Sequence, residues 1–326
     1  MANESGILIL AEHKNGELLG ISTELLGVAR RLADTLAQKI SAVALGTGAG
    51  QAAKATIAFG ADTGLSVETS ALDQYTNDAW TGAMAAVAKE VNPAIILIGQ
   101  TMTGRDLAPR LAIRLGTAVA MDCIELAGRD GKLVMTRPCF GGSAHAQYTS
   151  NTMPQMATVR AKSQEPLPRD DSRSGDVKSL NVDATSQAKV LGREEVKAEG
   201  LRLEDAPVVI SGGRGLGGPE GFEPLQELAK VLGGAVGASR AVVDLGWVPV
   251  SMQVGLTGKV VTPDLYIAVG ISGASQHMAG ISSVKNIVAV NKDKEAGIFN
   301  ASRFGVVTDW KAFVTAFTEE CRKLKA

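Results

Sequence analysis

Cysteine, histidine and aromatic residues are all scarce in this chain of 326 residues. It contains three cysteines and three histidines, and aromatic residues make up 4% of its composition. The cysteines lie far apart and match no Cys-x-x-Cys pattern, so we expect no zinc site, no iron–sulfur centre and no dithiol redox site. The sequence therefore predicts no bound metal ion.

An excess of charge of one sign is also missing. The chain has 33 Lys and Arg against 34 Asp and Glu, a formal net charge of −1. No dense basic stripe is present, so a nucleic-acid partner is not expected. No apolar run approaches the roughly 18–20 residues that cross a bilayer, and no signal peptide precedes the first strand-like segment. We expect no direct membrane insertion and a cytoplasmic location.

Small and aliphatic residues are plentiful instead. Hydrophobic residues make up 45% of the chain, and 37 residues are glycine. This composition favours an α/β fold with mostly parallel sheets flanked by helices, and the length favours two domains. We predict an N-terminal α/β domain at 1–204, including a polar connecting segment at 163–204. A doubly wound domain is predicted at 205–326.

The N-terminal half alternates strand and helix patterns. Short apolar runs indicate strands buried on both faces, and the segments between them keep helical spacing. Such an alternation favours right-handed crossovers and a parallel sheet. The predicted strands are 7–11, 41–45 and 94–98, and the predicted helices are 25–36, 77–90 and 106–115. We expect Ser22 or Thr23 to cap the first helix, and Arg105 and Asp106 to begin the third.

After residue 118 the pattern changes. Segments 132–137 and 156–160 alternate as antiparallel strands do, and an outlying strand is expected near 189–191. The second half then returns to parallel strands separated by helices. We predict strands at 207–210, 265–269 and 286–290, and helices at 223–232 and 310–324.

A glycine-rich turn follows the first strand of the second half. Gly213, Gly215 and Gly218 have the spacing G-x-G-x-x-G, which lets backbone approach a phosphate but also occurs in ordinary tight turns. An NAD site should carry an acid at the end of the next strand. Ser239 and Arg240 stand there instead, and Asp244 follows four residues later. An NAD(P)-dependent oxidoreductase is therefore the alternative, because Arg240 could read a 2′-phosphate.

Further polar and glycine-rich segments follow the later strands. Thr257 lies between two glycine turns, and the strand 265–269 leads into a second glycine turn before His277. A strand, a glycine turn and a helix start form an anion-binding corner at the carboxyl end of a parallel sheet. Asn291 closes the next strand, and Asp309 precedes the last helix.

Together these segments resemble the FAD-binding domain of electron transfer flavoprotein α subunits, the large subunits of that family. The resemblance extends over nearly the whole chain, through Gly104–Ala112 and Arg137–Gly142 in the first half. The matching motifs of the second half are Ser211–Gly215, Gly237–Arg240, Gln253–Lys259, Ser272–His277 and Asn291.

The resemblance implies a bound FAD and a set of residues that hold it. Arg214, Ser239 and Ser272 would hold the diphosphate, with Asn291 and Asp309 at the adenosine end. Arg240 would lie against the isoalloxazine ring, Thr257 near N5, and Gln276 and His277 near the pyrimidine side. The full expected set is Arg214, Ser239, Arg240, Gln253, Val254, Gly255, Leu256, Thr257, Ser272, Gly273, Ala274, Ser275, Gln276, His277, Asn291, Asp309 and Trp310.

The resemblance also implies a function and partners. The chain would be one half of a heterodimer, with a β subunit that binds AMP or, in electron-bifurcating members, a second FAD. It would be a redox carrier rather than an enzyme with its own substrate. Electrons would pass from donors such as the acyl-CoA dehydrogenases of fatty acid β-oxidation to a quinone-reducing or other acceptor, through an anionic semiquinone. Leu256 departs from the family, which usually has Gln there.

Overall fold

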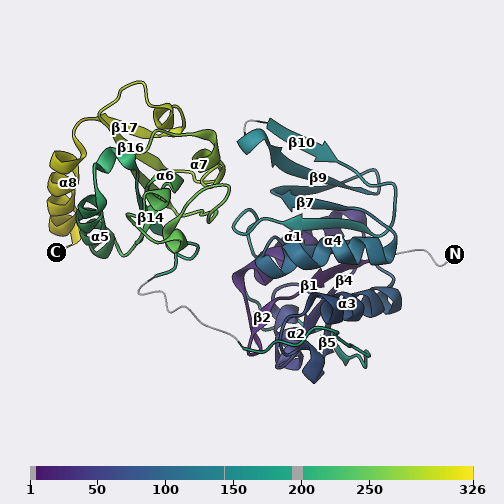
Figure 1. Ribbon diagram of the computed structural model, residues 1–326. Helices are drawn as coiled ribbons and strands as arrows, with labels where there is room; N and C mark the ends of the chain where they lie inside the picture. The colour runs from purple at the N-terminus through teal and green to yellow at the C-terminus, as the bar shows by residue number, and fades with distance from the viewer. Residues whose placement is uncertain (1–4, 143, 193–200, 326) are drawn as a thin grey trace. The chain divides into compact units, whose positions relative to one another are not determined.

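The computed structural model describes residues 5–142, 144–192 and 201–325. The described chain forms two compact units, each treated by itself below (Figure 1). Unit 1 comprises residues 5–139 and 145–192. Unit 2 comprises residues 140–142, 144 and 201–325.

Unit 1 is built on a seven-stranded sheet with the order β12-β5-β4-β1-β6-β11-β7. Its strand pairs are parallel. The direction of travel across the sheet reverses between β1 and β6, which makes this the switch point. The strands are β1 (Ile7–Leu10), β4 (Ile40–Leu45), β5 (Thr63–Val67), β6 (Ile95–Gly99), β7 (Val119–Cys123), β11 (Gln155–Val159) and β12 (Asp176–Ser179).

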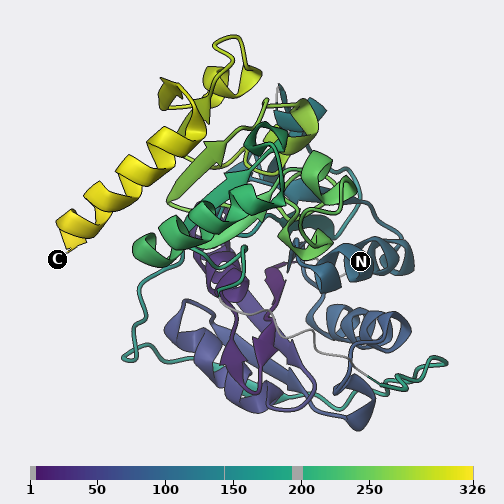
Figure 2. The ribbon, with the colours of Figure 1, turned by 60° about the vertical axis from the view of Figure 1, so that its left-hand side comes forward.

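Helices cover both faces of this sheet (Figures 1 and 2). Alternate side chains of β1 point to opposite faces. Ile7 and Ile9 pack with helix α1 (Gly20–Leu36), whereas Leu8 and Leu10 pack with α3 (Asn77–Val91) and α4 (Met102–Leu115). Burial on both faces explains why β1 is a continuous apolar run. This unit also contains helix α2 (Ala49–Ala58) and the smaller strands β2 (His13–Lys14), β3 (Glu17–Leu18), β8 (Glu125–Arg129) and β9 (Lys132–Cys139). Strand β10 (Ala144–Tyr148) belongs to it from residue 145 onward.

Unit 2 is built on a five-stranded parallel sheet with the order β14-β13-β15-β16-β17. Helices α5 and α8 cover the face that carries Ile210 and Ile267, while loops cover the face that carries Val209 and Tyr266. Its elements are β13 (Val208–Gly212), α5 (Phe222–Leu232), β14 (Ala235–Ala238), α6 (Arg240–Asp244), β15 (Leu265–Val269), α7 (Ser275–Ala279), β16 (Ile287–Asn291), β17 (Phe304–Val307) and α8 (Trp310–Lys325).

The predicted fold class is confirmed: two mostly parallel sheets flanked by helices. Two strand predictions are wrong. The segment 156–160 was expected to be antiparallel, but β11 lies parallel between β6 and β7 in the central sheet. No strand is found at 189–191, which the structure describes as irregular, and the connecting segment instead supplies β12 at Asp176–Ser179, paired with β5.

Two helix starts are also wrong. Helix α1 begins at Gly20, so Ser22 lies inside its first turn, where its hydroxyl donates to the Glu12 carbonyl at 2.7 Å. The third predicted helix, α4, begins at Met102, and the Thr101 side chain caps it by accepting from the Gly104 N–H at 3.0 Å. None of the described helices is long and apolar enough to cross a membrane.

Candidate functional site

A cavity of about 650 Å³ opens at the carboxyl ends of the unit 2 strands. Its lining comes from the loops that follow β13, β14, β15 and β16. In a doubly wound sheet with this strand order, the first and third strands separate the two winding directions, and ligands bind outside their carboxyl ends. Those strands are β13 and β15, so the cavity lies at the switch point.

Glycines allow the loops after β13 and β15 to approach each other closely. A Cβ atom on Gly213 would collide with the Gly270 carbonyl oxygen, and one on Gly215 would lie 2.8 Å from the Gly270 Cα. The Gly215 N–H donates to that same carbonyl at 3.0 Å. Gly270 itself has a φ of +64°, which a side chain would disfavour. The glycine-rich turn is therefore required by the meeting of two loops beneath the cavity.

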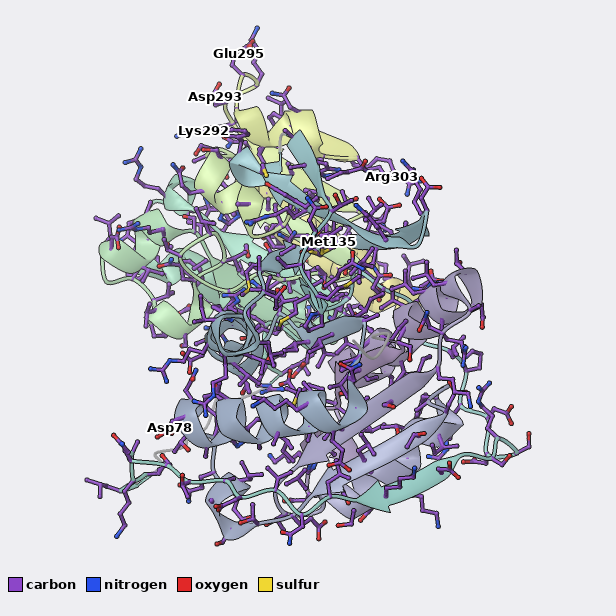
Figure 3. The ribbon with its side chains drawn as sticks, turned by 90° about the vertical axis from the view of Figure 1, so that its right-hand side faces the viewer. Asp78, Met135, Lys292, Asp293, Glu295 and Arg303 are labelled. Atoms are coloured by element: carbon purple, nitrogen blue, oxygen red, sulfur yellow. The ribbon has the colours of Figure 1, made fainter. Side chains whose placement is uncertain are left out.

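The lining of the cavity carries more positive than negative charge. Arg214, Arg240 and Lys292 line it, together with Asp293 as an acid. Lys292 and Asp293 lie on the loop after β16, and their side chains project outward (Figure 3). Arg240 also pairs with Asp244 through its Nε atom at 3.2 Å. Asp244, the acid that could have bound a ribose, is thus held by Arg240, and the charge of the lining suits a diphosphate better.

The loop after the short 3₁₀ helix η5 (Val250–Met252) presents the Thr257 hydroxyl at the cavity. The Gln253 side chain, which is buried, donates its Nε2 hydrogen to the Thr257 Oγ1 at 2.9 Å. The Gln253 carbonyl accepts from the Lys259 N–H at 2.8 Å, which closes the loop. Because Gln253 occupies a lone pair of the Thr257 oxygen, the hydroxyl hydrogen remains for a ligand. Leu256, in the same loop, leaves 65% of its surface exposed.

His277 lines the cavity but is itself buried. Its Nε2 atom lies 2.9 Å from the Tyr266 hydroxyl, and its Nδ1 has no hydrogen-bond partner of normal geometry among the described residues. Burial lowers the pKa of His277 to about 4, and the backbone of Val254 opposes part of this lowering. The imidazole is therefore neutral near pH 7.

Asn291 joins two of the loops around the cavity. Its Nδ2 donates to the Ile271 carbonyl at 3.0 Å, and its Oδ1 accepts from the Asp293 N–H at 3.0 Å. Both amide atoms are thus engaged by backbone. Asn291 therefore fixes the loop after β15 against the loop after β16.

The cavity brings together most of the predicted site residues, but four of them do not line it: Gly273, Ser275, Asp309 and Trp310. Gly273 has a φ of +86° and lies against the backbone of Ile298. Asp309 accepts from the Lys311 N–H at 2.8 Å at the start of α8, and Trp310 is buried in the core with α5. The roles of these four residues, like those of the other expected site residues, stay predictions.

The cavity also includes residues outside the expected FAD-holding set: Gly215, which was predicted only as part of the glycine-rich turn, and Ala241, Gly270, Ile271, Lys292, Asp293 and Ala296. Most of them follow a strand directly or lie within two residues of a predicted site residue. The rule that ligands bind at strand carboxyl ends could have found them. Ala296 carries no such signal.

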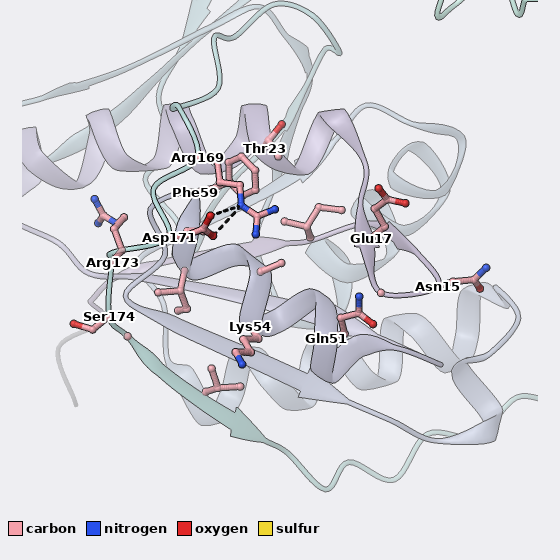
Figure 4. Close-up of a pocket in the computed structure, with 17 residues that line it drawn as sticks. Asn15, Glu17, Thr23, Gln51, Lys54, Phe59, Arg169, Asp171, Arg173 and Ser174 are labelled. Atoms are coloured by element: carbon pink, nitrogen blue, oxygen red, sulfur yellow. Dashed lines mark hydrogen bonds and ion pairs between the residues drawn. The ribbon is translucent and has the colours of Figure 1, made fainter.

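A second cavity, of about 790 Å³, lies in unit 1 against α2 and the β2–β3 hairpin (Figure 4). Arg169 there donates to the Asp171 carboxylate at 2.9 Å, so its charge is already paired. The side chains of Lys54 and Arg173 point in different directions in Figure 4. This cavity does not gather its charges around one point as a phosphate site would.

Both halves of the chain match models of known protein families. Residues 7–185 match the electron transfer flavoprotein domain, and residues 202–282 match the electron transfer flavoprotein FAD-binding domain. The second match spans the loops after β13, β14 and β15, which supply most of the cavity in unit 2.

Curated relatives are similar over the full length of the chain. The electron transfer flavoprotein subunit alpha of Thermoanaerobacterium thermosaccharolyticum is 44% identical over 330 residues, which cover 100% of both chains. That of Bacillus subtilis is 41% identical over 320 residues, which cover 98% of each chain. Protein FixB of Clostridium saccharobutylicum is 40% identical over 330 residues, covering 99% of this chain and 98% of that protein.

Proposed function

The chain belongs to the electron transfer flavoprotein α-subunit family and carries electrons through FAD, and we propose that the cavity of unit 2 holds this FAD. Its partner is an electron transfer flavoprotein β subunit. One observation carries the proposal: loops from four adjacent strands meet at the switch point around a cavity with an excess of positive charge.

The donor set of the cavity fits a flavin dinucleotide. The positive lining suits the diphosphate, and the hydroxyl hydrogen of Thr257 suits a ring with polar edges. Arg214, Ser239 and Ser272 would hold the diphosphate, and Asn291 and Asp309 would contact the adenosine end. On the ring, the assigned residues are Arg240 against its face, Thr257 near N5, and Gln276 and His277 at the pyrimidine side.

FAD supplies the redox chemistry, because it accepts one or two electrons. The chain's part is to set the charge around it. Arg240 places a guanidinium beside the cavity, although Asp244 offsets part of that charge. His277 is neutral, so it adds a hydrogen-bond donor rather than a positive charge. We therefore propose that the positive charge of Arg240 is the main group that favours an anionic semiquinone.

The electron donors and acceptor complete the proposal. Acyl-CoA dehydrogenases are proposed as donors and a quinone-reducing or other redox protein as acceptor, with the chain acting as a carrier in fatty acid β-oxidation. A β subunit holding AMP would make the heterodimer a simple carrier. A β subunit holding a second FAD would make it a bifurcating complex.

The test is a visible absorption spectrum of the chain coexpressed with its β subunit, followed by chromatography of the released cofactor. We expect flavin bands near ~370 and ~450 nm and noncovalently held FAD. One FAD per heterodimer indicates a simple carrier, and two indicate bifurcation. A colourless, folded complex that binds NADPH would instead support an NAD(P)-dependent oxidoreductase.

A substitution separates cofactor binding from redox tuning. His277→Ala should lower the yield of semiquinone in a reductive titration more than it lowers FAD content, because it removes a donor beside the ring. Equal semiquinone yields in the variant and the parent would contradict this role of His277.

A further inference from the structure

A buried pair of polar side chains lies beneath the cavity of unit 2. Tyr266 projects from β15 into the loop-covered face of the sheet and is 0% exposed. Its hydroxyl lies 2.9 Å from the Nε2 atom of His277, and the two rings are 6.1 Å apart between centroids. A phenol hydroxyl in an aliphatic core costs free energy unless it is hydrogen-bonded. A phenylalanine would occupy nearly the same space, so the hydroxyl calls for an explanation beyond packing.

The direction of this hydrogen bond decides which nitrogen of His277 carries the hydrogen. The ring is neutral near pH 7, and a neutral imidazole has one N–H and one acceptor nitrogen. If Nε2 carried the hydrogen and donated it to Tyr266, the phenol hydrogen would need a different acceptor. The Ser211 hydroxyl is not that acceptor, because its oxygen has no hydrogen-bond partner of normal geometry among the described residues.

The Tyr266 phenol is therefore the donor of this hydrogen bond, and Nε2 of His277 is the acceptor. Because a neutral imidazole carries one hydrogen, that hydrogen lies on Nδ1. The Nδ1 atom is buried and has no hydrogen-bond partner of normal geometry among the described residues.

We propose that Tyr266 is a positioning residue: it donates its hydroxyl hydrogen to Nε2 of His277 and so fixes the Nδ1–H tautomer. The pair then holds the His277 ring, which lines the cavity, neutral and in one orientation beside the ligand. The identity of that ligand as FAD rests on the proposed function. The tautomer of His277 does not, since it follows from the protein's own contacts.

The test uses nitrogen-15 NMR of the heterodimer with labelled histidine in this chain, because ring nitrogen shifts distinguish the two tautomers. The chain has three histidines, so His13→Gln and His145→Gln assign the His277 signals. We expect the Nδ1–H tautomer to dominate in the parent. Tyr266→Phe should give a mixture of tautomers and weaken FAD binding roughly threefold to tenfold, the effect of one neutral hydrogen bond.

Tyr75→Phe is the matched control. It removes a phenol of unit 1 that donates to the Asp106 carboxylate at 2.8 Å and does not line the cavity. Both the His277 tautomer and the FAD affinity should stay as in the parent.

Two results would overturn the proposal: a dominant Nε2–H tautomer in the parent, or an unchanged tautomer and FAD affinity in Tyr266→Phe. If Tyr266→Phe does not fold, the tautomer of the parent still decides. A heterodimer without FAD but with the Nδ1–H tautomer would defeat the proposed function and leave the role of Tyr266 standing.

Discussion

Units 1 and 2 share one architecture but treat the carboxyl ends of their strands differently. In unit 2, glycine turns after β13 and β15 leave a cavity above the switch point. In unit 1, the corresponding position between β1 and β6 is filled by the chain itself. The buried Glu12 carboxylate follows β1 there and accepts from the Thr101 hydroxyl at 2.8 Å, and a Cβ on Gly99 would collide with Glu12 and Ile21.

Other side chains of unit 1 also occupy the space at the carboxyl ends of its strands. The Thr158 hydroxyl donates to the Gln100 side chain and accepts from the Asp122 N–H at 2.8 Å. Arg160 forms two hydrogen bonds to the Asp122 carboxylate, at 2.9 and 2.6 Å. In both units a ligand could bind at the carboxyl ends of the parallel strands. The residues that follow these strands determine whether a cavity is present there.

The largest effect is expected from a substitution that disturbs the glycine turn below the unit 2 cavity. Gly213→Ala places a Cβ against the Gly270 carbonyl, and the required shift of either loop would displace the turn below the cavity. Overpacking of this kind costs about 1–3 kcal/mol, so FAD affinity should fall by about fivefold or more. Gly82→Ala is the control, since its Cβ meets no atom within 4 Å in helix α3. The measurement is the FAD content of the purified heterodimer. An unaltered FAD content in Gly213→Ala would show that the cavity of unit 2 does not depend on this glycine turn.

The next effect is on the stability of unit 1, where Glu12 occupies the space at the carboxyl end of β1. Burial raises the pKa of Glu12 from 4.5 to about 7. Between these pH values the folded chain holds a proton that the unfolded chain has lost, so this stabilisation is complete below about pH 4.5 and is lost as the pH rises through about 7. Glu12→Gln should remove a pH-dependent contribution on the order of 2–3 kcal/mol. Denaturant unfolding at pH 5 and pH 8 measures it, and parallel pH profiles for variant and parent would refute it.

A smaller effect compares one buried glutamine in each unit. Gln253→Met frees the Thr257 hydroxyl to rotate, and FAD affinity should fall roughly threefold to tenfold. Gln155→Met removes the acceptor of the buried Leu133 N–H in unit 1, at 3.0 Å. It should cost about 1–3 kcal/mol of stability and leave FAD affinity unchanged. Equal losses of FAD affinity in both variants would show that the two units are not independent in this respect.

The smallest effect is expected at Leu256. Its side chain is 65% exposed, so Leu256→Gln should leave the stability of unit 2 within about 0.5 kcal/mol. Its effect on FAD affinity should stay below about threefold, the lower range of one hydrogen bond. A fluorescence titration with FAD measures this affinity. A larger gain in FAD affinity would mean that the cavity of unit 2 lacks a contact with FAD at this position.

Residues with strong local signals were predicted well. The apolar runs of β1, β4, β6 and β15 indicated buried strands, and the glycine, serine and arginine positions after β13 and β14 indicated the cavity. Helix α2 and strand β5 were missed because their sequences, rich in alanine, glycine and threonine, show little periodicity. The parallel pairing of β11 could not be predicted, since its partners β6 and β7 are distant in sequence and alternation is not specific to antiparallel strands.

The pairing of Tyr266 with His277 was also beyond sequence reasoning. Tyr266 lies within an apolar strand, where an aromatic residue is expected for packing alone. Its contact with His277 depends on how the loop after β15 folds back over the sheet.

The carboxyl ends of the strands in the two units can be compared most directly by hydrogen–deuterium exchange of the heterodimer with and without FAD. We expect FAD to protect the unit 2 segments 211–216, 237–241, 253–259 and 270–277, and to leave exchange in the unit 1 segments 11–13, 99–102 and 158–162 unchanged. Protection of these unit 1 segments, or no protection of the unit 2 segments, would contradict this expectation.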